Sequence, residues 1–115
     1  MAIQWQSPTH GPISFTKHAH ASLWNEVAGI YMFCRLESQG TYTPLYIGQA
    51  GSLKQRIPQH EQWPRAVQQG ASFVLAALVP IQIDRDNIER QLIQHFNPTL
   101  NTQHKNALAG LLYAG

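Results

Sequence analysis

Acidic residues are scarce in this chain, which has only six Asp and Glu side chains among its 115 residues. They form no evident cluster along the sequence. A hydrolytic site with two catalytic metal ions needs several carboxylates that converge on the ions. A single magnesium ion, in contrast, is often held by one or two carboxylates and completes its octahedron with water and phosphate. The composition therefore argues against a two-metal site and leaves room for a one-metal site.

Cysteine, long apolar runs and surface charge are also in short supply. The lone cysteine, Cys34, excludes a disulfide framework, and its place in a strand pattern predicts a small buried hydrophobic residue. No apolar run is long enough to span a bilayer, and no signal-peptide pattern is present. We therefore expect a cytoplasmic protein without a membrane partner. Only 12% of the residues are charged and the net charge is +2, so a broad basic surface for nucleic acid is not expected.

The most informative feature that is present is a pair of short strings, Gly29-Ile30-Tyr31 and Tyr46-Ile47-Gly48. Each string is typical of a β-strand that carries one tyrosine. The turn-rich run 37–41 lies between them and predicts a hairpin. In such a hairpin the two phenols can converge on one reacting atom.

The rest of the chain predicts a single α+β domain, a small and mainly antiparallel three-stranded sheet flanked by helices. Strands are expected at 29–36, 44–48 and 72–79. Helices are expected from Leu53 after an N-cap at Ser52, from Pro64 to Gly70, and from an N-cap at Asp84 or Asp86 to Phe96. We divide the chain into an irregular N-terminal segment at 1–26 with a short helix near 21–27, a central domain at 27–101, and a C-terminal extension at 102–115 packed on that domain.

Further polar residues follow the two strings at characteristic spacings. An arginine lies ten residues after the second tyrosine, and a histidine follows it by four. A glutamate and, twelve residues later, an asparagine complete the set, which is Arg56, His60, Glu89 and Asn101. In this order and spacing the chain closely resembles the GIY-YIG nuclease superfamily over about residues 27–101. That superfamily includes homing endonucleases, some restriction enzymes and the N-terminal nuclease of the bacterial excision-repair incision subunit.

The resemblance implies an endonuclease that hydrolyses DNA phosphodiester bonds with one Mg²⁺ or Mn²⁺ ion. Glu89 is the implied metal ligand, and it lies at the edge of the apolar face formed by Ile88, Leu92 and Ile93. A second interpretation of Glu89 stays open, because Asp86-Asn87-Ile88-Glu89 has the spacing of a helix capping box. The other catalytic residues that the resemblance implies are Tyr31, Tyr46, Arg56, His60 and Asn101.

Roles can be assigned to these residues as hypotheses. Tyr31 is our choice for the general base, with Tyr46 orienting the water or the phosphate, and the two roles are exchangeable. Arg56 would clamp the scissile phosphate with its fork of donors, and His60 would donate to a phosphate or move a proton. Asn101 would brace the site by hydrogen bonds.

Two departures from the family pattern concern the surroundings of these residues. Pro58 should kink or break the helix between Arg56 and His60. Gln49 stands where some relatives carry a lysine after the second string, and it can form hydrogen bonds but adds no charge. The backbone of the strings themselves, at Gly29, Ile30, Ile47 and Gly48, would allow close approach of other groups.

The expected partner is nucleic acid, most simply DNA, because the resemblance is to DNA nucleases. The candidate nucleic-acid-binding side chains are Gln49, Lys54, Arg56, Arg65 and Lys105. Two rival interpretations remain. In the first, the chain is a non-catalytic nucleic-acid-binding module of the same fold. In the second, it is a nuclease subunit whose activity or specificity depends on a protein partner or on a homodimer.

Overall fold

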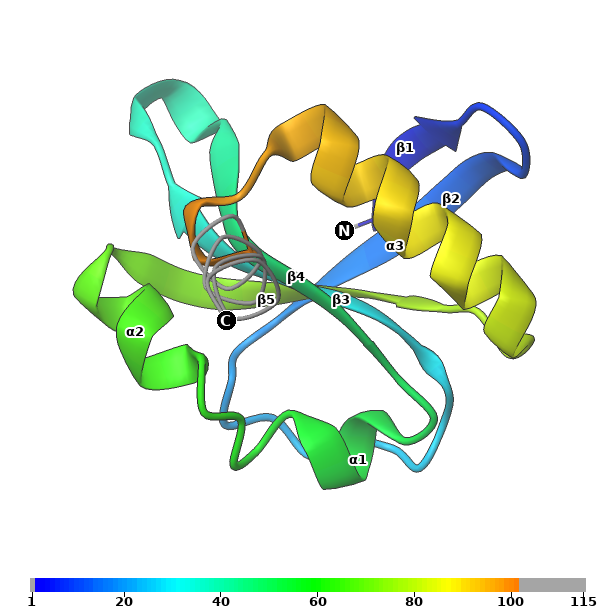
Figure 1. Cartoon of the computed structure of the whole chain (residues 1–115). Helices are drawn as coiled ribbons and strands as arrows, with labels where there is room; N and C mark the ends of the chain where they lie inside the picture. Colours follow the sequence, from blue (N-terminus) through cyan, green and yellow to red (C-terminus); the bar gives the residue numbers. More distant parts are fainter. Residues whose placement is uncertain (1, 102–115) are drawn as a thin grey trace, which may run out of the picture.

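The computed structural model describes residues 2–101, which form a five-stranded sheet covered by helices (Figure 1). The strands are β1 (Ala2–Ser7), β2 (Gly11–His18), β3 (Gly29–Leu36), β4 (Tyr42–Ala50) and β5 (Ala71–Leu78). They lie in the order β1-β2-β5-β3-β4, and each neighbouring pair is antiparallel. The α+β class and the antiparallel sheet are confirmed, but the prediction of three strands was wrong.

The two additional strands come from the N-terminal segment, which the sequence analysis expected to be irregular. β1 and β2 form a hairpin in which exposed and half-buried residues alternate. Only one face of this hairpin is therefore packed against the rest of the protein. Pro8, Gly11 and Pro12 obscured this pattern, although they lie in the turn and at the start of β2, where proline and glycine are tolerated. The helix expected near 21–27 is absent, and Trp24 reaches the core from an irregular loop.

The predicted hairpin is confirmed as β3 and β4. A 3-10 turn at Ser38–Gly40 joins the strands, and Gln39 and Gly40 both have positive φ angles there. In the register, Tyr31 lies opposite Gly48 and Phe33 lies opposite Tyr46. Since side chains alternate along a strand, both tyrosines project from the same face of the sheet.

The helices are α1 (Leu53–Arg56), α2 (Trp63–Gln68) and α3 (Gln82–Phe96). Ser52 caps α1 as predicted, since its hydroxyl accepts a hydrogen bond from the Gln55 N–H. α1 ends at Arg56, so the predicted break before Pro58 is confirmed. The predicted cap of α3 was wrong, because this helix already begins at Gln82 and Asp84 lies in its first turn.

The two faces of the sheet are covered by different elements. α3 packs on one face through Ile88 and Leu92, against Ile30, Met32 and other buried strand residues. α1, α2 and the loop around Trp24 cover the opposite face, where Tyr31 and Phe33 are buried. Cys34 is buried on the α3 face, as predicted. The sheet is therefore buried on both sides around β3 and β5, and β4 forms one edge.

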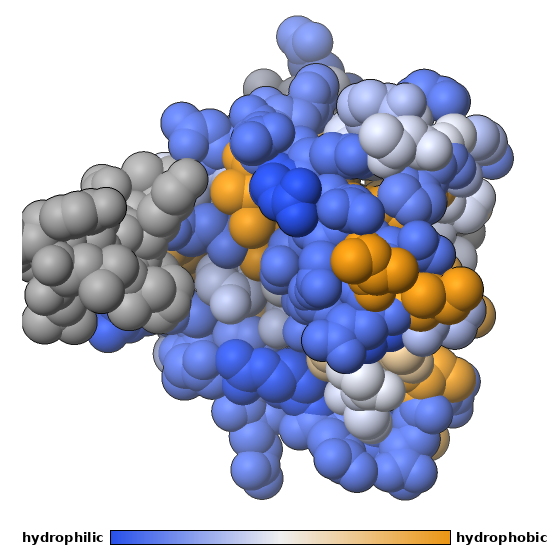
Figure 2. Space-filling model, turned by 45° about the vertical axis from the view of Figure 1, so that its right-hand side comes forward, coloured by the Kyte–Doolittle hydropathy of each residue, from blue (hydrophilic) through white to orange (hydrophobic). Residues whose placement is uncertain are grey.

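The surface carries few large apolar side chains. Figure 2 shows a face that is mainly hydrophilic, with separate hydrophobic spots. The exposed large hydrophobic residues of the described part include Leu23, Leu78, Ile81 and Ile83. Among residues 2–101, no helix is both long and apolar enough to cross a membrane.

Candidate functional site

Two tyrosines meet on the face of the sheet that α1 and α2 cover. The ring centroids of Tyr31 and Tyr46 are 6.4 Å apart. Tyr31 is only 1% exposed, and burial is the main cause that raises the pKa of its phenol well above the ordinary value, with the nearby Tyr46 adding to the shift. Burial also raises the pKa of Tyr46. Both phenols are therefore protonated at neutral pH in the free protein.

His60 reaches Tyr31 in spite of the broken helix. The Oη atom of Tyr31 lies 2.8 Å from Nε2 of the buried His60. Burial, helped by the neighbouring Arg56 charge, lowers the pKa of His60 to about 4, so the imidazole is neutral at pH 7. Its Nδ1 atom accepts a hydrogen bond of 3.0 Å from the Gln62 N–H. A neutral imidazole has one donor and one acceptor nitrogen, so Nε2–H donates to the Tyr31 oxygen.

This direction of the hydrogen bond assigns a definite role to His60. A donor on the Tyr31 oxygen stabilises the phenolate more than the phenol. His60 cannot at the same time accept the Tyr31 proton through Nε2. It is thus placed to support a Tyr31 phenolate, and not to act as a base toward Tyr31.

Gly48 gives the Tyr31 ring its space. A Cβ atom at position 48 would lie 2.4 Å from the Tyr31 Oη and 2.6 Å from its Cζ. We expect Gly48→Ala to displace the buried ring and to destabilise the fold by about 1–3 kcal/mol, the usual cost of overpacking. Urea denaturation measures this change. Gly51→Ala is the control, because nothing lies within 4 Å of the position that its Cβ would take. Equal stability of Gly48→Ala and wild type would contradict the close packing of Tyr31 on β4.

Arg56 lies beside the tyrosines and is held by a carboxylate. Its two terminal nitrogens each donate a 2.8 Å hydrogen bond to Glu61. The hydrogen bonds from Arg56 lower the pKa of Glu61 to about 2. The positive charge of Arg56 also acts to lower the pKa of Tyr31 and Tyr46, which places the guanidinium near both phenols.

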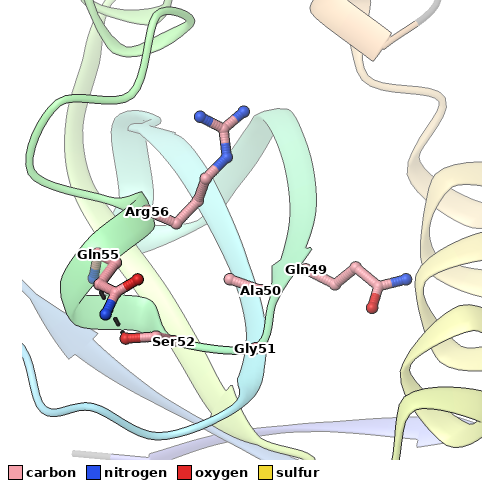
Figure 3. Close-up of a pocket in the computed structure, with 6 residues that line it drawn as sticks. All are labelled: Gln49, Ala50, Gly51, Ser52, Gln55 and Arg56. Atoms are coloured by element: carbon pink, nitrogen blue, oxygen red, sulfur yellow. Dashed lines mark hydrogen bonds between the residues drawn. The ribbon is translucent and has the colours of Figure 1, made fainter.

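A cleft of about 620 Å³ opens between the end of β4 and α1. Figure 3 shows the residues that line it, which are Gln49, Ala50, Gly51, Ser52, Gln55 and Arg56. In this view the side chains of Arg56 and Gln49 project in different directions from the two sides of the cleft, and Gln49 points toward α3. Gln49 is therefore the cleft residue that approaches the helix carrying Glu89.

Glu89 lies in the middle of α3, two turns after the helix start at Gln82. This position excludes the capping-box interpretation, because Glu89 is too far from the first turn to reach it. Burial raises the pKa of its carboxyl group above the ordinary value. Its negative charge in turn contributes to the raised pKa of Tyr31 and Tyr46. Glu89 thus acts on the phenols from α3, the helix on the other face of the sheet, and the Gln49 amide of β4 reaches it at 3.4 Å.

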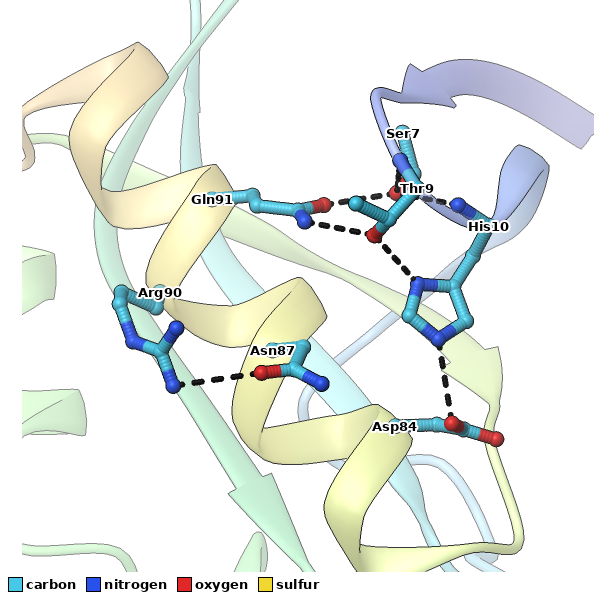
Figure 4. A network of polar contacts seen from close by, with 7 residues as sticks. All are labelled: Ser7, Thr9, His10, Asp84, Asn87, Arg90 and Gln91. Atoms are coloured by element: carbon cyan, nitrogen blue, oxygen red, sulfur yellow. Dashed lines mark hydrogen bonds and ion pairs between the residues drawn. The ribbon is translucent and has the colours of Figure 1, made fainter.

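α3 is fastened to the β1–β2 turn at two places along its length, Asp84 and Gln91 (Figure 4). The Ser7 hydroxyl donates to the Gln91 side-chain oxygen at 2.7 Å, and the Gln91 amide donates to the Thr9 hydroxyl at 2.7 Å. Two helical turns before Gln91, the Asp84 carboxylate lies 3.1 Å from His10 Nε2. These contacts fix the position of α3 along the sheet and with it the position of Glu89.

Asn101 holds the free edge of β4. Its side-chain oxygen accepts a 2.7 Å hydrogen bond from the Ile47 N–H, and its amide donates a 2.8 Å hydrogen bond to the Ile47 carbonyl. Ile47 stands between Tyr46 and Gly48 in the sequence. Asn101 thus completes the backbone hydrogen bonds of the edge strand, which is the bracing geometry expected of it.

The remaining candidates lie at the rim or outside the described part. Lys54 and Arg65 are exposed, as a role in phosphate contact requires. Gly29 lies against the backbone of β5, since a Cβ at this position would be 2.3 Å from the Ala77 carbonyl oxygen. Ile30 is buried in the core. Lys105 lies outside the described residues.

Two residues near the site were missed by the sequence analysis. Glu61 left no sequence signal, because its contact with Arg56 depends on the irregular loop after Pro58. Arg85 could have been found, since it precedes Glu89 by four residues and therefore shares a face of α3 with it. Arg85 is 7% exposed, which is unusual for an arginine.

The donor set fits a magnesium-type ion. Residues 2–101 hold no group of three or more His, Cys, Asp or Glu side chains that could bind a metal, so a closed zinc-type site is not built there. Glu89 is half-buried and the pKa of its carboxyl group is raised, and its hydrogen-bond partner within residues 2–101 is the Gln49 amide, at 3.4 Å. A cation would therefore compensate the charge of this carboxylate. One such carboxylate is a typical protein ligand of Mg²⁺.

Comparisons with known proteins gave a match at the level of structure. No family model matches the chain, and no curated protein matches it. Among solved structures, the chain is similar to the GIY-YIG N-terminal endonuclease domain of UvrC from Thermotoga maritima, with 28% sequence identity and a TM-score of 0.52. The match covers 67% of this chain and 84% of that chain. That domain is a tyrosine-to-phenylalanine point mutant bound to its catalytic divalent cation. The resemblance indicated by the sequence motifs is thereby confirmed: the chain has a GIY-YIG nuclease-like domain.

Proposed function

We propose that this protein is a metal-dependent endonuclease that hydrolyses phosphodiester bonds of DNA. The observation that carries the proposal is the pair of tyrosines on β3 and β4, whose ring centroids are 6.4 Å apart and whose pKa values respond to the charges of both Arg56 and Glu89. The likeness to a nuclease domain that was bound to its catalytic divalent cation supports it.

Each residue then has a part in the hydrolysis. A Mg²⁺ or Mn²⁺ ion held by Glu89 would supply charge stabilisation at the phosphoryl and leaving oxygens. Arg56 clamps the scissile phosphate with its guanidinium. Tyr31, as its phenolate, accepts the proton of the attacking water. The Nε2–H of His60 stabilises this phenolate. Tyr46 orients the water or the phosphate. Lys54 and Arg65 contact the backbone away from the cut.

The pH dependence of the rate follows from the pKa shifts of Tyr31 and His60. A base with a raised pKa is mostly protonated at pH 7. While the pH lies below that pKa, the deprotonated and active fraction rises about tenfold for each unit by which the pH increases. His60, with a pKa of about 4, is already neutral above pH 5 and adds no step. We expect the logarithm of the single-turnover rate to rise with a slope near one between about pH 6 and 8, without an inflection near 6.5. A rate that levels off at pH 7 would contradict Tyr31 as the base.

Glu61 competes with DNA for Arg56 in this mechanism. A phosphate that binds the guanidinium end-on must replace the Glu61 carboxylate, and an exposed ion pair of this kind is worth about 0.2–1 kcal/mol. We expect Glu61→Gln to bind duplex DNA about twofold to fivefold more tightly, with an unchanged log–log salt slope, because Arg56 neutralises the same phosphate in both proteins. Fluorescence anisotropy at several salt concentrations measures both quantities.

The matched control is Glu37→Gln, because Glu37 forms a similar two-bond pair with Arg35. This pair lies at the β3–β4 turn and belongs to no part of the proposed site. We expect unchanged DNA binding in this variant. Weaker binding by Glu61→Gln would show that Glu61 orients Arg56 instead of competing for it.

A substrate panel tests the proposed function and its rivals. Labelled duplex, branched and single-stranded DNA and RNA are each incubated with the protein in Mg²⁺, in Mn²⁺ and in EDTA. The nuclease predicts cutting that requires the ion. Binding without cutting in every arm would favour the non-catalytic module. Cutting that appears only above a protein concentration at which light scattering detects dimers would favour a site that depends on self-association.

A further inference from the structure

The buried Arg85 contacts the proposed site through the side chain of Gln49, which has no part in the proposed mechanism. The Nε atom of Arg85 donates a 3.1 Å hydrogen bond to the Gln49 side-chain oxygen. One terminal nitrogen of Arg85 donates to the carbonyl oxygens of Val79 and Pro80, each at 3.0 Å. These bonds hold the guanidinium rigidly against the loop between β5 and α3. Arg85 therefore presents a fixed donor to the end of β4.

The fixed donor determines how the Gln49 amide is oriented. A glutamine side chain has one oxygen that accepts and one nitrogen that donates. Because Arg85 occupies the oxygen, the nitrogen must face the opposite direction, where it lies 2.5 Å from Asp86 Oδ1 and 3.4 Å from Glu89 Oε1. A flipped amide would place its nitrogen against the guanidinium and its oxygen against two carboxylates. Arg85 thus excludes the alternative orientation.

The amide nitrogen in turn links two carboxylates of α3. Asp86 and Glu89 are three residues apart and therefore lie on one face of the helix. Both line a cavity of about 370 Å³ together with Arg90, Ile93 and Gln94. The two hydrogens of one NH₂ group can serve one carboxylate each. Gln49 therefore restrains the rotamers of both carboxylates from a neighbouring strand.

We propose that Arg85 and Gln49 are positioning residues that orient the carboxylates of Glu89 and Asp86 for the divalent cation. This inference rests on the proposed function, in which Glu89 binds the ion. Groups that form hydrogen bonds to a metal ligand, without contacting the ion themselves, typically contribute 10- to 100-fold to metal affinity. Gln49 performs this task without adding a positive charge beside the ion, whereas a lysine at this position would bring one.

The test is a titration of the full chain with Mn²⁺, in which electron paramagnetic resonance measures the free ion. We expect Gln49→Met, which keeps the length of the side chain and removes the amide, to weaken Mn²⁺ binding by about 10- to 100-fold. Arg85→Met should weaken it by a similar factor. Arg35→Met is the control and should bind Mn²⁺ like wild type, because Arg35 donates to Glu37 and to the Gln69 carbonyl oxygen at the β3–β4 turn, away from the carboxylates of α3.

The double variant Arg85→Met/Gln49→Met distinguishes positioning from a merely structural role. If Arg85 acts through Gln49, the double variant should bind Mn²⁺ no more weakly than the weaker single variant, because contacting residues are not additive. Multiplicative losses would overturn the relay. If Arg85→Met does not fold, Gln49→Met alone tests the inference, and a Mn²⁺ affinity within about twofold of wild type overturns it.

A fourth variant, Glu89→Gln, keeps the inference separate from the proposed function. Loss of Mn²⁺ binding in Glu89→Gln together with normal binding in Gln49→Met would overturn the positioning role and leave the metal site in place. Normal Mn²⁺ binding in Glu89→Gln would overturn the metal assignment on which both proposals rest. Weak binding in both variants, with normal binding in Arg35→Met, is the expected result.

Discussion

Glu89→Gln is expected to reduce the Mg²⁺-dependent cleavage rate by at least about 100-fold, since a metal ion at a phosphoryl group supplies several kcal/mol of transition-state stabilisation. The glutamine amide keeps the shape of the glutamate side chain and buries no charge, so the fold should be retained. Single-turnover rates at saturating protein measure the loss, and circular dichroism with thermal unfolding checks the fold.

The Glu37→Gln variant is the control for this substitution as well, because it removes a carboxylate of the same kind at the β3–β4 turn. It should cleave at the wild-type rate. If Glu89→Gln keeps more than about a tenth of the wild-type rate, a barrier change of less than ~1.4 kcal/mol, Glu89 is not the metal ligand.

Tyr31→Phe is expected to lower the cleavage rate by about 10²- to 10⁴-fold, the usual contribution of a general base. The phenyl ring keeps the packing against Phe33 and Gly48, so the variant should fold and bind DNA with nearly unchanged affinity. His60 Nε2–H loses its acceptor in this variant. Rate and affinity measured on the same duplex separate the chemical step from binding.

Tyr42→Phe is the matched control, because Tyr42 lies on β4 but packs against Phe96 on the α3 face. Loss of the Tyr42 hydroxyl should leave the cleavage rate unchanged. A greater loss in Tyr46→Phe than in Tyr31→Phe would exchange the roles of the two tyrosines. Wild-type rates in both variants would exclude a tyrosine base.

The sequence predicted β3, β4 and β5 well and the N-terminal hairpin of β1 and β2 poorly. β3, β4 and β5 carry apolar runs bounded by turn residues, and both tyrosines stand at fixed offsets from glycines, so their placement followed from local pattern. β1 and β2 are half-exposed and contain Pro12 and Gly11, so their short-range pattern is weak. Their place in the sheet depends on the pairing of β2 with β5, a contact across more than fifty residues, while β1 pairs with β2.

The site shows the same division between local and long-range information. The break at Pro58 was predictable, since proline acts on its own helix. That His60 nevertheless reaches Tyr31 depends on the loop after the break and on a hydrogen bond from the backbone at Gln62. The Arg85–Gln49 contact likewise joins segments whose approach is fixed by tertiary packing, and the Arg56–Glu61 pair depends on the conformation of the loop after Pro58.

Single-turnover cleavage of an end-labelled duplex, with and without Mg²⁺, is the most direct test of a nuclease built on Tyr31 and Glu89. Analysis of the product ends completes the measurement. The proposed mechanism predicts cutting that requires the ion and leaves a 5′-phosphate and a 3′-hydroxyl. Intact DNA under conditions in which the protein demonstrably binds it, or cutting that persists in EDTA, would contradict the mechanism.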